Sequence, residues 1–448
     1  MADTLSSLLP ALPSAFIWGA STSAYQIEGA VAEDGRGPSI WDTRCRLAGG
    51  IGDGSTADIA ADHYHRWRED IGLMRELGIG AYRFSVAWPR LLPRGRGKVN
   101  PAGLAFYDRL IDGLLEAGIE PWLCLYHWDL PQALDDLGGW TNRDCVGWYE
   151  DYAVLVARRY GDRVKHFATF NEFSVFTLFG YAIPWAAPGL SDRAAHLRAI
   201  HHVNLAHGAG VDILRSHVKD ASIGGIHNRQ AVRPASNAPA DQDAAALLDA
   251  HWNGVFCDPQ CLGAYPDRVA ETIEPFVKPG DLARICRPLD WLGLNHYGPI
   301  FARADASTPW GYGWADTPPA PIDPAIGWAI FPEAFTEELL TLHHRYHLPI
   351  YVTENGCGGG AGSDQPDANG QVADSHRIAY LRTYLAALNT ALTQGADVRG
   401  YFVWSLLDAF EWGSGYGPRF GLIHVDFASG TRTLKHSGQW YRSLIQSS

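Results

Sequence analysis

The sequence lacks the features that mark several broad classes of protein. No apolar run approaches the ~18 residues of a membrane span, and no Lys or Arg precedes Arg36, so the basic start of a secretory signal is missing. The seven cysteines include no C-x-x-C pair, and the chain contains no N-x-S/T sequon. We therefore expect a cytoplasmic protein with no membrane partner, whose thiols are reduced and mostly buried.

Positive charge and several catalytic motifs are also scarce. Lys and Arg number 36 against 49 Asp and Glu, and the net charge of −13 argues against a nucleic-acid partner. The motifs of serine hydrolases and nucleotide enzymes (G-x-S-x-G, the P-loop and G-x-G-x-x-G) are absent. His343 and His347 have the spacing of a zinc-binding pair, but no Glu lies between them. We expect an exposed helix face there, and neither a metal nor another cofactor.

What the chain does have is a repeated alternation of short apolar runs with longer amphipathic stretches. Strands are expected at 16–22, 79–86, 120–126, 166–171, 222–227, 290–296, 349–354 and 398–404. Helices are expected at 63–77, 103–117, 144–160, 194–217, 333–346 and 374–394. Eight such units predict an α/β fold, a single (β/α)₈ TIM barrel, over one catalytic domain at 1–448.

The chain is longer than a bare barrel of ~250 residues, so roughly 200 residues should form long loops at the C-terminal face. The segments 303–325 and 356–370 are rich in Pro, Gly, Ala and Asp and are expected to be two of these loops. Both follow predicted strands. We therefore expect them at the rim where barrel enzymes build their active sites.

Two of the predicted strands run directly into a glutamate. Glu172 follows the fourth strand and Glu354 ends the seventh. A single such residue is as well explained by a salt bridge at the rim of the barrel. Two of them, three strands apart around one barrel, point into a common cavity, and two carboxylates are the minimal apparatus for cleaving a glycosidic bond.

The remaining strand ends carry residues suited to binding a sugar. Arg83 could form an ion pair with a catalytic carboxylate and keep it ionised. Side chains that can bind hydroxyls or stack on sugar faces occur at the other strand ends: His127, Trp128, Asn295, Tyr297 and Trp404.

Several longer motifs identify a family. They are Phe16-Ile17-Trp18-Gly19 through Tyr25-Gln26-Ile27-Glu28-Gly29, Thr169-Phe170-Asn171-Glu172, Thr353-Glu354-Asn355-Gly356, Trp404-Ser405-Leu406-Leu407-Asp408-Ala409-Phe410-Glu411-Trp412 and Arg419-Phe420-Gly421-Leu422. In this order and at these strand ends, they make the sequence resemble glycoside hydrolase family 1, the β-glucosidase family, along nearly its whole length.

The resemblance implies a role for each matching residue. Glu172 would be the general acid/base and Glu354 the nucleophile. Arg83, Asn295 and Tyr297 would orient the nucleophile. Substrate would contact Gln26, His127, Trp128, Asn171, Tyr297, Trp328, Trp404, Glu411, Trp412 and Phe420, with Trp404 beneath the sugar and Trp328 stacked on the leaving group. A cis peptide is expected at Trp404–Ser405.

The implied activity is that of a retaining β-glucosidase, extending to β-fucosides and β-galactosides. It would release the terminal non-reducing sugar from a small-molecule β-glycoside, such as a cello-oligosaccharide or an aryl glucoside. The two carboxyl groups should lie ~5–5.5 Å apart, the spacing of a double displacement. Repulsion from Glu354 should raise the pKa of Glu172. The oligomeric state stays open, with a homo-oligomer among the options.

Two alternatives and two departures from the family pattern accompany this prediction. A 6-phospho-β-glycosidase should carry a basic phosphate clamp where this chain has Glu411 and Trp412, and a non-catalytic sugar-binding relative would lack one or both glutamates. Phe173 stands where the family usually has Pro, and Ala409 where it usually has Asn. The second departure removes an amide beside Glu411, so it questions how that loop is held.

Overall fold

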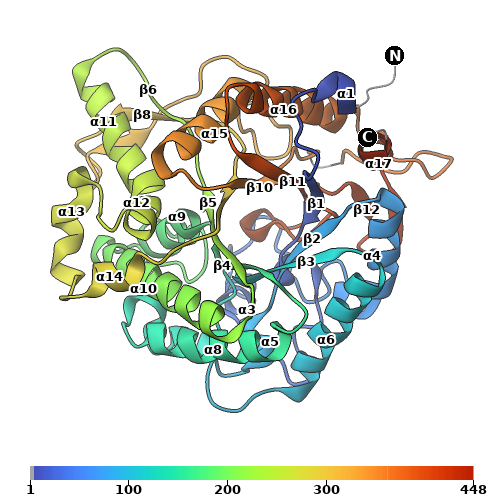
Figure 1. Ribbon diagram of the computed structural model, residues 1–448, viewed down its shortest axis with the longest axis horizontal. Helices are drawn as coiled ribbons and strands as arrows, with labels where there is room; N and C mark the ends of the chain where they lie inside the picture. Colours follow the sequence, from blue (N-terminus) through green and yellow to red (C-terminus); the bar gives the residue numbers. More distant parts are fainter. Residues whose placement is uncertain (1–4, 361, 447–448) are drawn as a thin grey trace.

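The computed structural model describes residues 5–446 except residue 361, and its centre is a closed barrel of eight parallel strands (Figure 1). The strand order around the barrel is β1-β11-β10-β7-β5-β4-β3-β2. The strands are β1 (Ile17–Ser21), β2 (Ala81–Ser85), β3 (Glu120–Tyr126), β4 (His166–Asn171), β5 (Ser222–Asn228), β7 (Trp291–Asn295), β10 (Ile350–Asn355) and β11 (Val398–Trp404). All eight predicted strands are present, and the TIM-barrel prediction is confirmed.

The long helices surround the barrel and agree closely with the amphipathic stretches predicted from the sequence (Figure 1). They are α4 (His63–Leu77), α6 (Pro101–Glu116), α8 (Cys145–Tyr160), α10 (Arg193–His217), α15 (Pro332–Tyr346) and α16 (Ser375–Thr393). Each buries several apolar residues. No helix of the described residues is long and apolar enough to cross a membrane.

The barrel interior is filled by side chains from different strands. The ring of Trp122 in β3 lies 5.3 Å from that of Trp291 in β7 and 5.1 Å from that of Phe402 in β11. All three are buried and pack with Ala81 and Ile226. Residues from so many strands meet only on the barrel axis, so the barrel is a packed core closed below its C-terminal rim.

Short helices complete the connections. On the N-terminal and central parts they are α1 (Leu5–Leu8), α2 (Ala24–Ile27), α3 (Ile40–Cys45), α5 (Trp88–Leu91), α7 (Gln132–Asp135) and α9 (Phe173–Thr177). Between β5 and β7 lie α11 (Pro239–Asp249), α12 (Val255–Cys261), α13 (Asp267–Ile273) and α14 (Asp281–Ile285), and the chain ends on α17 (His436–Gln446). The sequence analysis did not anticipate these elements.

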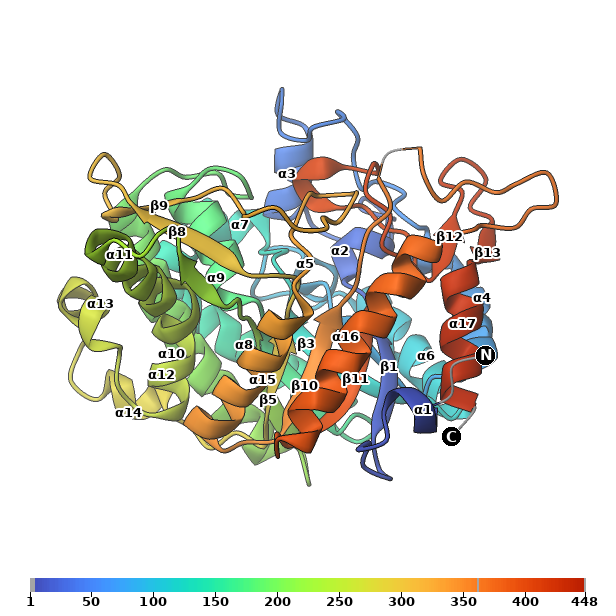
Figure 2. The same ribbon diagram turned by 90° about the horizontal axis from the view of Figure 1, so that it is seen from above.

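The segment 303–325 is not a plain loop, which corrects the prediction. β8 (Ile300–Ala304) pairs with β6 (Val232–Pro234) and with β9 (Tyr312–Trp314) in a separate sheet. Its strands are short and partly exposed, so the sequence shows no sustained alternation. A second pair joins β12 (Ile423–Val425) to β13 (Arg432–Leu434). In Figure 2 these additions lie above the barrel strands, on the side of α3.

A buried ionic cluster fixes the loop that follows β11. Lys435 Nζ lies 2.7 Å from Asp408 Oδ1 and 2.8 Å from Asp364 Oδ2, and all three side chains are buried. Arg419 pairs with the other oxygen of Asp408 at 3.0 Å, and Arg377 pairs with Asp364 at 2.8 Å. The cluster therefore ties the start of α17 to two rim loops, the segment 356–370 that contains Asp364 and the loop after β11 that contains Asp408.

The seven cysteines are all free, and five of them are buried. The buried ones are Cys45, Cys124, Cys145, Cys257 and Cys357.

Candidate active site

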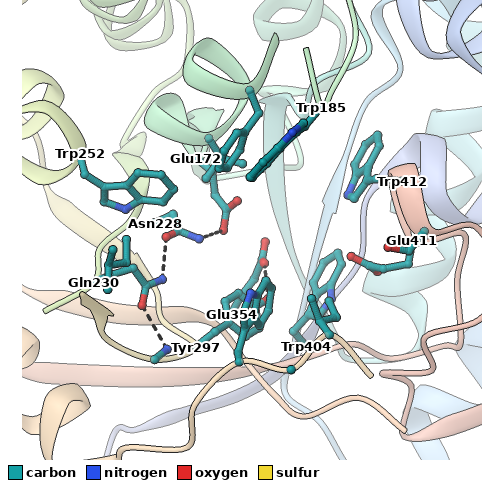
Figure 3. A pocket seen from close by; sticks show the side chains of 18 of the residues that line it. Glu172, Trp185, Asn228, Gln230, Trp252, Tyr297, Glu354, Trp404, Glu411 and Trp412 are labelled. Carbon is teal, nitrogen blue, oxygen red and sulfur yellow. Dashed lines mark hydrogen bonds between the residues drawn. The ribbon is translucent and has the colours of Figure 1, made fainter. Parts of the chain in front are cut away.

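A cavity of about 480 Å³ opens at the C-terminal ends of the barrel strands (Figure 3). Most of the residues predicted to form the site line it: His127, Trp128, Asn171, Glu172, Tyr297, Trp328, Glu354, Trp404, Glu411, Trp412 and Phe420. The other three, Gln26, Arg83 and Asn295, lie behind these and donate hydrogen bonds to them. The structure thus brings all of the predicted residues together.

Glu172 lies directly after β4 in a left-handed backbone conformation, with φ 53°. Its amide N–H donates to the carbonyl of Ile226 at 2.8 Å, which holds this turn in place. Trp128 and Trp412, which also line the cavity, have φ values of 75° and 46°. Such conformations cost non-glycine residues of order 1–3 kcal/mol each and are typical of functional sites.

The Glu172 carboxyl is shielded from water. Asn228 Nδ2 and Asn295 Nδ2 donate to its Oε1 atom at 2.9 and 2.8 Å. Burial, and secondly the charge of Glu354, raise the pKa of Glu172 to about 8, while the two amides oppose the rise. Repulsion between the two carboxylates was expected, but burial is the larger cause.

Glu354 has a different environment, since it is held by a cation and a hydroxyl. Arg83 Nη1 lies 2.6 Å from Glu354 Oε1, and the Tyr297 hydroxyl donates to Oε2 at 2.7 Å. Burial raises the pKa of Glu354, and both partners oppose the rise, with Arg83 the larger influence. The two glutamates of one cavity therefore have different partners, two amides at Glu172 and a cation and a hydroxyl at Glu354.

His127 is positioned to offer a hydrogen-bond donor to a ligand. Burial lowers the pKa of His127 well below its usual value, so the ring is neutral. Its Nε2 lies 3.0 Å from Asn171 Nδ2, which can only donate, so Nε2 accepts and Nδ1 carries the proton. This Nδ1 is buried and without a partner among the described residues. A buried donor of this kind needs an acceptor, such as a sugar hydroxyl.

Glu411 also lines the cavity, and Gln26 Nε2 donates to its Oε2 at 3.1 Å. Burial and the charges of Glu354 and Glu172 raise the pKa of Glu411 to about 8. The ring of Trp412 lies 4.6 Å from that of Trp128. Trp404 and Trp412 lie near Glu411 (Figure 3). Flat rings beside polar groups suit a sugar, which has apolar faces and hydroxyl edges.

The two departures from the family pattern have local compensation. Phe173 is fully buried and its ring stacks 4.8 Å from that of His227. Near Ala409, Asp408 is held by the ionic cluster, and the Phe410 N–H donates to the Gln26 carbonyl at 3.0 Å. The loop carrying Glu411 is therefore fixed without the missing amide. The cis peptide expected at Trp404–Ser405 is present.

The residues that line the cavity but were missed by the sequence analysis include Trp185, Asn228, Gln230, Trp252 and Trp314. Asn228 ends β5, so the argument used for the other strand ends would have found it. Trp185 lies in a turn that follows β4 and α9 in the chain. It is 64% exposed, which is rare for a side chain of its size. Trp252 and Trp314 belong to the segments whose structure was not predicted.

Searches against known proteins give a consistent result. The model of glycosyl hydrolase family 1 matches residues 9–448. The chain is 42% identical to a β-glucosidase of Agrobacterium sp. over 98% of this chain and 96% of that protein. It is also 42% identical to a bifunctional β-D-glucosidase/β-D-fucosidase of Bifidobacterium breve, over 97% and 98% of the two chains.

Solved structures agree. The β-glucosidase from Thermotoga maritima in complex with glucoimidazole is similar to this chain with a TM-score of 0.93 and 39% identity, over 97% of this chain and 99% of that one.

Proposed function

The chain belongs to glycosyl hydrolase family 1, and we propose that it works as a retaining β-glucosidase with Glu172 as acid/base and Glu354 as nucleophile. The observation that supports these roles is that two buried glutamates line one cavity in unlike environments. Glu172 has amide partners and a pKa of about 8, whereas Glu354 is paired with Arg83. Glu172 is therefore suited to donate a proton, whereas Arg83 and the Tyr297 hydroxyl favour the charged form of Glu354.

The reaction begins when Glu354 attacks the anomeric carbon and Glu172 protonates the leaving oxygen. The negative charge of Glu354 disappears on formation of the glycosyl–enzyme, and the pKa of Glu172 then falls because a repelling charge has gone. Glu172 becomes a base, removes a proton from water, and the water attacks the same anomeric carbon. Two inversions at the anomeric carbon retain its configuration. This mechanism predicts that the carboxyl groups of Glu172 and Glu354 lie ~5–5.5 Å apart.

We further propose substrate contacts for the remaining predicted residues. Gln26, His127, Trp404, Glu411 and Trp412 bind the terminal sugar, and Trp328 contacts the leaving group at the cavity mouth. The name of the Bifidobacterium relative supports activity on β-fucosides as well as β-glucosides, and β-galactosides complete the proposed range.

A phosphorylated substrate is not favoured. None of the described residues lining the cavity is Lys or Arg, so a phosphate group would find no cation to pair with there. A purely sugar-binding role is not favoured either, because both glutamates are present.

We propose in addition that the whole chain acts as one catalytic domain and works in the cytoplasm.

The test uses the two glutamate positions separately. Glu354→Gly should abolish turnover, and azide or formate should restore cleavage with an inverted product, since the small anion occupies the face left by the carboxylate. Glu172→Ala, given an activated substrate and azide, should yield the β-glucosyl azide, because azide then attacks the glycosyl–enzyme. Glu116→Gly changes an exposed glutamate and should retain normal turnover. Wild-type activity in Glu354→Gly, or a rescued product of β configuration, would reject the assignment.

A further inference from the structure

Beyond the two glutamates, we propose that Gln230 and Asn228 form a positioning relay that places the acid proton of Glu172 on its Oε2 atom. The proposal rests on the acid/base role of Glu172 given above. It assigns a role to two buried amides that the sequence motifs do not include. Neither amide reacts with the substrate, and both act through Glu172.

The relay is a chain of three hydrogen bonds (Figure 3). The Gly298 N–H donates to Gln230 Oε1 at 3.1 Å. Gln230 Nε2 donates to Asn228 Oδ1 at 2.6 Å, and Asn228 Nδ2 donates to Glu172 Oε1 at 2.9 Å. Gln230, Asn228 and Glu172 are all buried.

The direction of this chain is fixed at its origin. A side-chain amide can rotate by half a turn and exchange its donor for its acceptor, but a backbone N–H can only donate. Gly298 therefore sets the orientation of Gln230. Gln230 in turn sets the orientation of Asn228, so that only an N–H faces Glu172.

The backbone of Gln230 is anchored as well. Its N–H donates to Asn253 Oδ1 at 3.2 Å, and its carbonyl accepts from Asn253 Nδ2 at 2.8 Å. Asn253 Nδ2 also donates to Asp249 Oδ1 at 2.7 Å. The backbone N–H and C=O of Gln230 are thus both held by the Asn253 side chain. The side-chain amide of Gln230 therefore extends from a fixed backbone position.

A second amide reaches the same oxygen from a second fixed origin. Arg83, which has donors only, donates through Nη2 to Asn171 Oδ1 at 2.5 Å. Asn295 Nδ2 donates to that same Oδ1 at 3.1 Å and to Glu172 Oε1 at 2.8 Å. The Thr353 hydroxyl donates to Asn295 Oδ1 at 2.7 Å. Both amides beside Glu172 are therefore locked as donors.

Two donors on Oε1 decide where the proton of Glu172 resides. An O–H at Oε1 would face two N–H groups and have no acceptor, whereas a carbonyl-like Oε1 accepts both. The neutral acid therefore carries its proton on Oε2, the oxygen that remains available to a leaving group. When Glu172 is ionised, the same two donors stabilise the carboxylate.

Gln230→Glu is the sharpest test, because it preserves size and reverses the relay. In its ionised form the carboxylate of Gln230→Glu can only accept, so Asn228 then turns its N–H toward position 230 and its carbonyl toward Glu172. The proton of Glu172 then moves to Oε1, away from the leaving group. A general acid contributes typically 10²–10⁴-fold, and only to leaving groups that need protonation.

We expect kcat/KM for phenyl β-glucoside at pH 6 to fall at least tenfold in Gln230→Glu. The value for 2,4-dinitrophenyl β-glucoside, whose leaving group departs without a proton, should stay within twofold of wild type and thereby report correct folding. The matched control is Gln242→Glu, the same change at an exposed position of α11, which should alter neither value.

Contrary outcomes have distinct meanings. An equal fall for both substrates would indicate a merely structural role, and no fall would show that the proton is placed by other groups; either result overturns the relay. A purely electrostatic effect of the new charge would move the alkaline limb of the pH profile upward and leave the rate at pH 6 unchanged, which also overturns it. In Glu172→Ala, assayed beside these variants, kcat/KM must fall selectively for phenyl β-glucoside. If it does not, the proposed function fails rather than the relay.

Discussion

Replacing Glu172 by Gln should make the protein more stable at neutral and alkaline pH. Folding places the Glu172 carboxyl in a buried site beside Glu354, which raises the pKa of Glu172 from 4.5 to about 8. Ionising the group is therefore harder in the folded than in the unfolded protein. A glutamine keeps the size of the side chain, and its carbonyl oxygen can accept the hydrogen bonds of Asn228 and Asn295.

The sign and size of the effect follow from linkage. Below pH 4.5 Glu172 is protonated in both states and costs nothing. As the pH rises toward 8, the unfolded state alone loses the proton, so the free energy of unfolding falls by about 1.4 kcal/mol for each pH unit. The loss is about 3 kcal/mol at pH 7 and about 5 kcal/mol above pH 8, where it becomes constant.

The assay is urea unfolding of wild type and Glu172→Gln at intervals from pH 4 to pH 9. The difference in unfolding free energy should be near zero at pH 4, grow through pH 5–8 and then level off. Glu116→Gln, which changes an exposed side chain, should show no such trend. A difference that stays the same at every pH would refute the reasoning, because it would show that the charge of Glu172 is not what costs stability.

Three further results are expected. Since general acid catalysis requires the protonated form of Glu172, kcat/KM for phenyl β-glucoside should fall about tenfold between pH 7 and pH 9 in wild type; a limb already complete below pH 6 would contradict the value of about 8. Trp185→Ala should raise KM for naphthyl β-glucoside but not for methyl β-glucoside, because the exposed indole lies at the cavity mouth, stacked on Phe179 at 5.1 Å; an equal rise for both would contradict this placement. Lys435→Met should lower the free energy of unfolding, measured by urea titration, by about 3–5 kcal/mol, because it leaves Asp364 and Asp408 buried without their shared cation. A change below about 1 kcal/mol would show that Arg377 and Arg419 are sufficient partners for the two carboxylates.

The barrel could be predicted because its strands are buried on both faces. Runs such as 120–126 and 398–404 are almost continuously apolar, and their boundaries coincide with those of β3 and β11. The sheet of β6, β8 and β9 gave no comparable signal, since its strands have three to five residues with exposed members. Its pairing depends on contacts between distant segments that no local pattern records.

The site shows the same division between local and distant information. Glu172 and Glu354 were visible because one directly follows an apolar strand and the other lies at the end of one. The hydrogen bonds that set their chemistry join residues remote in sequence, such as Arg83 with Glu354 and Asn228 with Glu172. Gln230 lies beyond the end of β5 and belongs to no motif, so only its contact with Asn228 indicates a role.

The closure of the barrel between β1 and β11 has a consequence for how the protein is made. Gln26 and Glu411, which meet across the sugar-binding side of the cavity, are 385 residues apart along the chain. At translation rates of about 5–20 residues per second, tens of seconds separate their emergence from the ribosome. A nascent chain therefore contains Glu172 long before Glu411 completes the sugar-binding residues. A ligand of the complete cavity can stabilise only the finished polypeptide.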